Sequence, residues 1–138
     1  HSPTMDDSIG GGLYGAVSIL GGDEAPPDRE FVVFLESQLG FMTIDGRAFV
    51  GNTPVFHARK GDVVQWDVLA LGDDFHTFHV HGHRWLTADG PRDTQVIGPA
   101  ESYKIRWRED IAGTWLYHCH VESHMMNGMI GIYRVSRR

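Results

Sequence analysis

The chain has a single cysteine among its 138 residues, so no internal disulfide can form within it. Its longest apolar runs, such as FVVFL at 31–35, are far shorter than the roughly 20 residues that cross a bilayer. Basic residues are in deficit, with 12 Lys and Arg against 18 Asp and Glu and a formal net charge of -6. Because binding a polyanion needs a basic face, we do not expect nucleic acid as a partner, and the short apolar runs argue against a membrane. No signal peptide is visible, and the first residue, His1, indicates a processed or trimmed product.

Long helical periodicity is also missing, and short segments rich in β-branched and aromatic residues take its place. They lie at 12–20, 29–37, 62–71, 102–108, 114–121 and 129–135. Clusters of Gly, Pro and Asp separate them, and Asp-Gly within 43–49 predicts a hairpin. Residues 121–128 are expected to form at most a short helical turn. The pattern predicts an all-β sandwich or small barrel, with a Pro-rich linker at 21–28.

Histidine is crowded into two short motifs. FHTFHVHGHRW (75–85) contains His76, His79, His81 and His83, and LYHCHVESHMMNGM (116–129) contains His118, Cys119, His120, His124 and Met129. Successive side chains of a strand point to opposite faces. The alternation predicts two sites: one of Cys119 with His76, His124 and Met129, and one of four imidazoles, His79, His81, His118 and His120.

The two groups suit different metal chemistry. Two histidines, a thiolate and a weakly held methionine are the ligands of blue copper, whereas zinc prefers four strong ligands and gains nothing from a thioether. The imidazole-only group suits copper that must bind an oxygen species. Since Cys119 is bonded to His118 and His120, a short covalent path joins the two groups.

The motifs H-xx-H-x-H-G and H-C-H-xxx-H-xxx-G-M resemble the copper-binding signature of multicopper oxidases, in their C-terminal cupredoxin domain, and most closely that of two-domain bacterial small laccases. The resemblance implies a Greek-key, cupredoxin-like β-sandwich. It also implies a type 1 copper on His76, Cys119, His124 and Met129, a type 2 copper on His79, and a type 3 pair on His81, His118 and His120. The family oxidises phenols or aromatic amines and reduces O2 to water.

This chain departs from the family pattern in two places. Thr77 stands where the signature usually has proline, as it does in small laccases. The trinuclear copper cluster also needs about twice as many histidines as the chain supplies, the others coming from a first cupredoxin domain. Residues 1–22 resemble the end of such a domain plus a linker, with His1 at the first position of a His-x-His pair and Pro3 at the second.

The expected organisation follows from that half-set of ligands. Residues 23–138 are predicted to form one cupredoxin domain, and another domain or chain is needed to complete the cluster. We therefore expect a homo-oligomer, and by resemblance a secreted or periplasmic location.

Other residues have two interpretations each. Asp93 is either a proton relay for O2 reduction or a turn cap. His83 is expected to support a ligand or lie at the surface. His1 either chelates copper through its terminal amine and imidazole or belongs to a disordered terminus. Met125 and Met126 are expected to pack, with a methionine exposed at the copper as the alternative. His57 is expected at a strand surface, and Tyr103 in the core rather than at the rim of the type 1 site.

Two other functions remain open beside the oxidase. A lone blue-copper electron-transfer protein has no use for the four additional histidines. A copper nitrite reductase takes only one type 2 ligand from this segment, so the second histidine of His-Cys-His argues against it.

Overall fold

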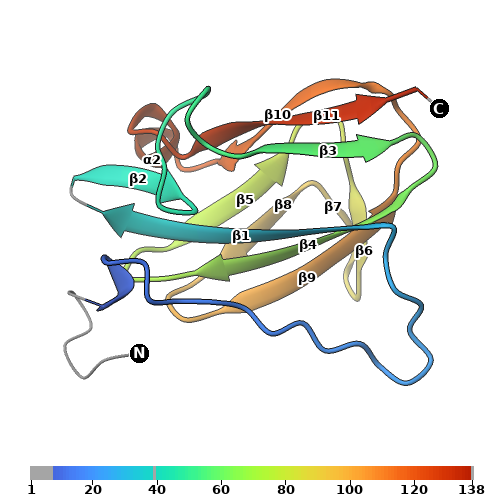
Figure 1. Cartoon of the computed structure of the whole chain (residues 1–138), viewed down its shortest axis with the longest axis horizontal. Coiled ribbons are helices and arrows are strands. Elements are labelled where there is room, and N and C mark those ends of the chain that lie inside the picture. The colour runs from blue at the N-terminus through green and yellow to red at the C-terminus, as the bar shows by residue number, and fades with distance from the viewer. Residues whose placement is uncertain (1–7, 39, 138) are drawn as a thin grey trace.

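A computed structural model describes residues 8–38 and 40–137 of the chain (Figure 1). Its strands are β1 (Arg29–Gln38), β2 (Phe41–Ile44), β3 (Val55–Arg59), β4 (Val63–Ala70), β5 (His76–Val80), β6 (Trp85–Thr87), β7 (Gly90–Arg92), β8 (Thr94–Ile97), β9 (Ser102–Arg108), β10 (Gly113–Cys119) and β11 (Ile130–Ser136). One short helix, α2 (Glu122–Met126), lies between β10 and β11. No helix in the described ranges is long and apolar enough to cross a membrane.

Two sheets form the body of the molecule. The first has the order β2-β1-β4-β9 and the second the order β3-β11-β10-β5-β8, while β6 and β7 form a separate hairpin. In each sheet one pair is parallel, β1 with β4 and β3 with β11, so the chain crosses between sheets rather than meandering within one. The all-β sandwich predicted from the sequence is confirmed.

The core lies between the sheets and is dominated by aromatic rings. Trp66 of β4 is fully buried, and its ring centroid lies 4.8 Å from that of Phe31, 5.1 Å from Tyr133 and 5.5 Å from Phe78. These contacts join both sheets around one side chain. Such a core fixes how far apart the strands lie, and with them the residues that they carry.

The local predictions have mixed outcomes. Asp45 and Gly46 both have positive φ, and Ile44 bridges to Arg47, which confirms the hairpin turn within 43–49. The short helical turn is confirmed as α2. The β6–β7 hairpin and β8 were not predicted from the sequence.

The strand predicted at 12–20 is wrong. This segment forms no ladder and instead lies against side chains of β4 and β9. The Gln65 amide donates to the Ser18 hydroxyl at 3.2 Å, and the Lys104 ammonium donates to the Ile19 carbonyl at 3.0 Å. Side chains rather than a neighbouring backbone hold the segment, and most of its apolar residues are exposed, Val17 at 89%.

Candidate metal centre

The first of two side-chain groups forms where β5 begins and β10 ends. On β5 the burial alternates, so His76 faces the core with Phe78 while the intervening residues face outward. Phe78 is in register with Cys119, the last residue of β10, and His124 comes from α2. The Cys119 Sγ lies 3.9 Å from His76 Nδ1 and 3.6 Å from His124 Nδ1, and the two nitrogens are 3.3 Å apart.

The triangle of these three atoms has the dimensions of a metal site. Ligand bonds of about 2.0 Å to nitrogen and 2.3 Å to sulfur, spread in one plane, place the ligand atoms roughly 3.5–3.8 Å from one another. Burial, and then the nearby His124, lower the pKa of His76 to about 4. The His76 imidazole is therefore neutral near pH 7 and has a nitrogen lone pair to offer. A trigonal His2Cys set of this kind fits copper.

Two further residues form hydrogen bonds with the sulfur or the backbone of Cys119. The backbone N–H of Thr77 donates to Cys119 Sγ at 3.3 Å. Met129 is fully buried, accepts a hydrogen bond from the Cys119 amide at 3.1 Å and donates one to the His124 carbonyl at 3.0 Å. These bonds hold the backbone of the expected fourth ligand beside the other three residues.

The second group, called the imidazole group below, consists of His79, His81, His118 and His120. Its ring centroids lie 5.1–5.5 Å apart in five pairs. The Nε2 atoms of His81 and His118 are 3.0 Å apart, and ligand nitrogens of these two and His79 all lie within 4.8 Å of one another. Burial and neighbouring imidazoles lower the pKa of His81 and of His118, which keeps both rings neutral. The exposed His120 lies beside this trio rather than within it.

Backbone carbonyls fix which ring nitrogen is free. His79 Nδ1 donates to the Asp93 carbonyl at 2.6 Å, and His118 Nδ1 donates to the Cys119 carbonyl at 2.8 Å. With Nδ1 protonated, Nε2 of each ring carries the lone pair, as a metal ligand requires. Asp93 therefore contacts the group through its backbone, while its carboxylate accepts from the Thr94 hydroxyl at 3.2 Å and lines a cavity of about 490 Å³ beside His79.

Glu109 is the polar residue that sequence reasoning missed. It is buried, and it accepts hydrogen bonds from His83 Nε2 at 3.0 Å, Trp107 Nε1 at 2.5 Å and the Tyr133 hydroxyl at 2.5 Å. His83 Nδ1 donates to the His81 carbonyl at 2.7 Å, so the His83–Glu109 pair holds the loop of a histidine in the imidazole group. Burial lowers the pKa of His83, but the bond and charge of Glu109 outweigh it and the net shift is upward. In the sequence, Glu109 looks like one more polar residue of a turn.

Of the remaining residue predictions, some agree with the structure and others do not. His83 is buried, which excludes its surface interpretation, and it bonds to the backbone of the candidate ligand His81. His57 is exposed on β3 as predicted. Tyr103 is 37% exposed at the start of β9, and Met126 is 68% exposed at the end of α2. The predicted core position of Tyr103 and the predicted packing of Met126 are therefore wrong. His1 lies outside the described residues.

Comparison with known proteins identifies related chains. The sequence profile of the multicopper oxidase family matches residues 24–138. A probable nitrite reductase-hydroxylamine oxidoreductase fusion protein of Kuenenia stuttgartiensis is 36% identical over 94% of this chain and 18% of its own length. Ceruloplasmin of Rattus norvegicus is 36% identical over 74% of this chain and 10% of its own. The chain thus spans less than a fifth of these two relatives.

The fold is also similar to that of solved multicopper oxidases. The crystal structure of Fet3p, described as a multicopper oxidase that functions in iron import, superposes with a TM-score of 0.72 at 18% identity. The match covers 82% of this chain and 32% of that one. At this identity the likeness concerns the fold, which is that of a cupredoxin domain.

Proposed function

Because the chain belongs to the multicopper oxidase family, whose cofactor is copper, we propose that it is the copper-binding domain of a laccase-like oxidase. In this proposal Cys119, His76, His124 and Met129 hold a type 1 copper. The imidazole group supplies half of a trinuclear cluster, with His79 on the type 2 copper and the other three histidines on the type 3 pair. Copper would supply one-electron oxidation of the donor at the first group and reduction of O2 at the completed second.

The observation that carries the proposal is the position of one tripeptide. Cys119 points into the sandwich and meets His76 and His124, while its bonded neighbour His118 points outward into the imidazole group. Two kinds of redox site are thus joined through a few covalent bonds. The overall reaction balances when four donor molecules each lose one electron, and O2 takes up four electrons and four protons to give two waters.

Exposed apolar side chains beside the first group support an organic donor. Phe75, next to His76, is 66% exposed, and Met126, two residues after His124, is 68% exposed. Apolar surface of this kind favours contact with an aromatic ring more than with a hydrated ion. We therefore propose phenols or aromatic amines as donors.

The proposal includes a second domain or chain, because four imidazoles are about half of a trinuclear ligand set. Residues 1–22 would continue from a preceding cupredoxin domain into 23–138. Homo-oligomer formation would then bring a second ligand set to the imidazole group, with Asp93 available near it to pass protons. A secreted or periplasmic location belongs to the same proposal and rests on the family resemblance.

Nitrite reduction is the second candidate, favoured by the name of the Kuenenia stuttgartiensis relative. A nitrite reductase of the copper type needs one ligand from the His-Cys-His segment in its second site. Here the second histidine of that segment, His120, also lies in the imidazole group, with its ring centroid 5.3 Å from that of His79 and 5.5 Å from that of His118. The oxidase is therefore the better supported of the two.

Oxygen consumption by the copper-loaded chain, with a phenol, ferrous iron or nitrite supplied in parallel, tests the proposal. We expect intense blue colour in the wild type, its loss in Cys119→Ser and its retention in His120→Ala. In the intact, completed enzyme we expect phenol-driven O2 uptake that His120→Ala abolishes.

Each alternative has its own outcome. Blue colour that survives Cys119→Ser overturns the type 1 assignment. Nitrite consumed in place of O2 establishes the reductase, and iron oxidised in preference to phenol corrects the donor. A blue chain that takes up no O2 until another domain is supplied supports the half-cluster.

A further inference from the structure

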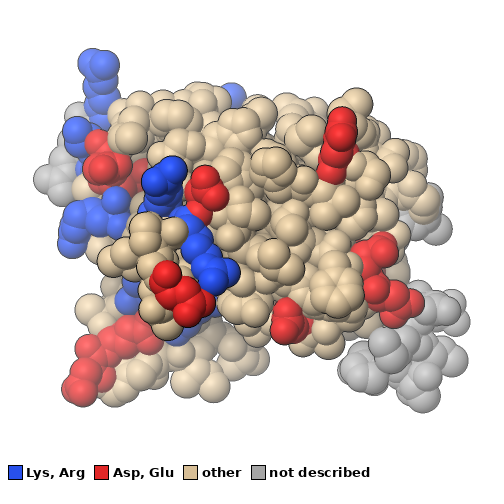
Figure 2. Space-filling model, turned by 180° about the vertical axis from the view of Figure 1, so that it is seen from behind, with Lys and Arg blue, Asp and Glu red and all other residues tan. Residues whose placement is uncertain are grey.

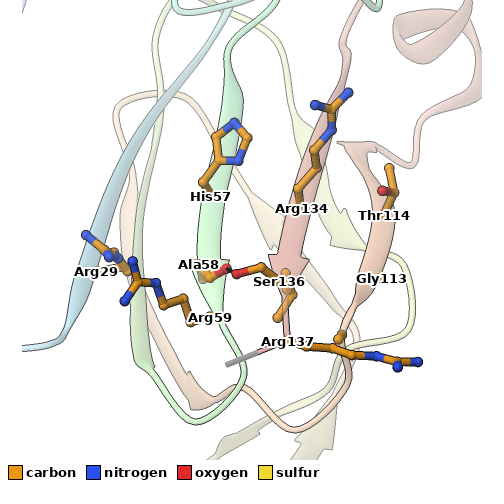
Figure 3. A pocket seen from close by; sticks show the side chains of 11 residues that line it. Arg29, His57, Ala58, Arg59, Gly113, Thr114, Arg134, Ser136 and Arg137 are labelled. Carbon is orange, nitrogen blue, oxygen red and sulfur yellow. Dashed lines mark hydrogen bonds between the residues drawn. The ribbon is translucent and has the colours of Figure 1, made fainter.

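A cleft of about 750 Å³ is lined by residues where β1 begins and where β3 and β11 end (Figure 3). Figure 1 shows that these strand ends lie at the same end of the molecule. Four of the chain's twelve basic residues line it, together with one histidine and two hydroxyl side chains: Arg29, Arg59, Arg134, Arg137, His57, Thr114 and Ser136. No Asp or Glu is among the residues that line it. In a chain with a net charge of -6, this is a local reversal of sign.

The sheet register brings these residues together from segments far apart in sequence. Arg134 of β11 is paired with His57 of β3 on one side and Thr114 of β10 on the other. Figure 3 shows His57 and Arg134 side by side on neighbouring strands, with Arg59 farther along β3. Because Tyr133 and Val135 are buried in the core, Arg134 projects outward into the cleft.

Most of this positive charge is uncompensated. Arg29 forms one ion pair, from Nε to Asp62 at 3.4 Å, and the same carboxylate accepts from the Arg59 backbone N–H at 2.9 Å. Within the described residues, the guanidinium groups of Arg59, Arg134 and Arg137 form no ion pair. Figure 2 shows Lys and Arg gathered mostly toward one end of the face seen from behind, where Asp and Glu also lie. Unpaired guanidinium groups around a hollow attract anions, and their planar N–H pairs match the geometry of phosphate and carboxylate oxygens.

We propose that this cleft binds a small oxyanion of at least two negative charges, such as a phosphate group. A volume of this size suits a small molecule, and a concave site of separate guanidinium groups favours a compact polyvalent anion over a flat protein surface. The hydroxyl groups of Thr114 and Ser136 add neutral donors beside the charged ones. The cleft shares the outward face of β10 with His118, four residues from Thr114 and thus roughly 13 Å along the strand. The cleft is therefore separate from the Cys119 group and from the imidazole group, and the proposal is independent of the proposed function.

Titration calorimetry of the copper-loaded chain with inorganic phosphate at constant ionic strength tests the proposal. We expect one phosphate per chain, weaker binding of monovalent nitrate, and a loss of affinity of at least about tenfold in the double variant Arg59→Gln/Arg134→Gln. The matched control is Arg47→Gln/Arg92→Gln, which removes the same charge from exposed positions outside the cleft. This control should bind phosphate within about twofold of the wild type.

The control separates a site from a general charge effect. Equal losses in both double variants, nitrate binding as tight as phosphate, or no phosphate binding at all would overturn the proposal. Phosphate bound with full affinity by the cleft variant would place the anion elsewhere, for example at copper, and would overturn it as well. Because all four substituted side chains are exposed, thermal unfolding of each variant should match the wild type and exclude misfolding.

Discussion

At the scale of single residues, the amide of Thr77 is the contact that most directly tunes the Cys119 sulfur. Its N–H donates to Sγ at 3.3 Å, while the Thr77 hydroxyl lies farther away, at 3.9 Å. A donor at a thiolate withdraws electron density from it and favours the reduced state of a bound metal. Where the family signature usually has proline, this amide donor would be missing.

We therefore expect Thr77→Pro to lower the reduction potential of the bound copper by tens of millivolts. The Thr77 N–H goes to sulfur rather than to the sheet ladder, so the strand should tolerate proline. Redox titration followed through the blue absorption measures the change. Thr77→Val is the matched control, because it keeps the amide and loses only the distant hydroxyl, and it should stay near the wild-type potential. Equal potentials in wild type and Thr77→Pro would show that the amide does not act on the sulfur.

The candidate ligands were predictable because metal chemistry restricts residue type and a strand alternates with period two. That reasoning divided the histidines of the two motifs as the geometry does. Glu109 was not predictable, since its role depends on the fold that buries it, just after the end of β9, next to His83. The basic cleft was not predicted for the same reason. Its arginines come from three separate segments of the sequence and are brought together only by the register of the sheet.

At the scale of elements, β10 and β11 pack closely because one of them has no side chain at a crowded position. Gly131 of β11 is in register with Tyr117 of β10, whose ring is fully buried and whose hydroxyl donates to the Pro54 carbonyl at 2.8 Å. A Cβ at Gly131 would overlap that ring. Since the ring is held on all sides, it cannot move aside without losing its hydrogen bond.

Gly131→Ala should accordingly lower the free energy of unfolding by about 1–3 kcal/mol. The free energy of unfolding is measured by urea denaturation of the metal-free chain, monitored through tryptophan fluorescence. Gly15→Ala is the control, because nothing lies within 4 Å of a Cβ there, and we expect almost no change. A Gly131→Ala chain as stable as the Gly15→Ala chain would mean that β10 and β11 can separate enough to admit the methyl group.

Elements were predictable where local pattern and tertiary environment agree, as in the strands that became β4 and β9. The segment 12–20 has β-branched and aromatic residues too, yet it finds no strand edge to pair with. A strand needs a partner backbone, and composition alone does not say whether one is available. The short β8 was missed although three of its four residues are β-branched, because a run of four residues is too short to stand out in sequence until it pairs with β5.

At the scale of the whole molecule, folding forces several imidazoles together in their neutral form. The pKa of His76 falls to about 4, and the pKa values of His81 and His118 are lowered as well. A histidine whose pKa is lower in the folded state contributes stability that is present above its unfolded pKa and lost as the pH falls toward its folded pKa. The metal-free chain should therefore lose stability between about pH 6.5 and pH 4.

The pKa values of other groups are shifted as well, and some of these shifts oppose the loss of stability on acidification. The pKa of His83 is raised, so its contribution is complete below pH 6.5 and stays constant through the window. Burial raises the pKa values of Glu36 and Asp45, and their protonation at the acid end favours the folded state. The net curve thus combines opposing effects, and a comparison of variants isolates the histidines.

His76 should account for about 2–3 kcal/mol of the loss between pH 7 and pH 4. The measurement is urea denaturation of the metal-free chain at both pH values, for the wild type, His76→Gln and His57→Gln. The His76 variant should lose less stability on acidification than the wild type, whatever its stability at pH 7. The His57 variant, altered at an exposed position outside both groups, should follow the wild type. If all three lost the same amount, protonation of His76 would not be opposed by folding, and its ring would have to reach water or a carboxylate in the folded chain.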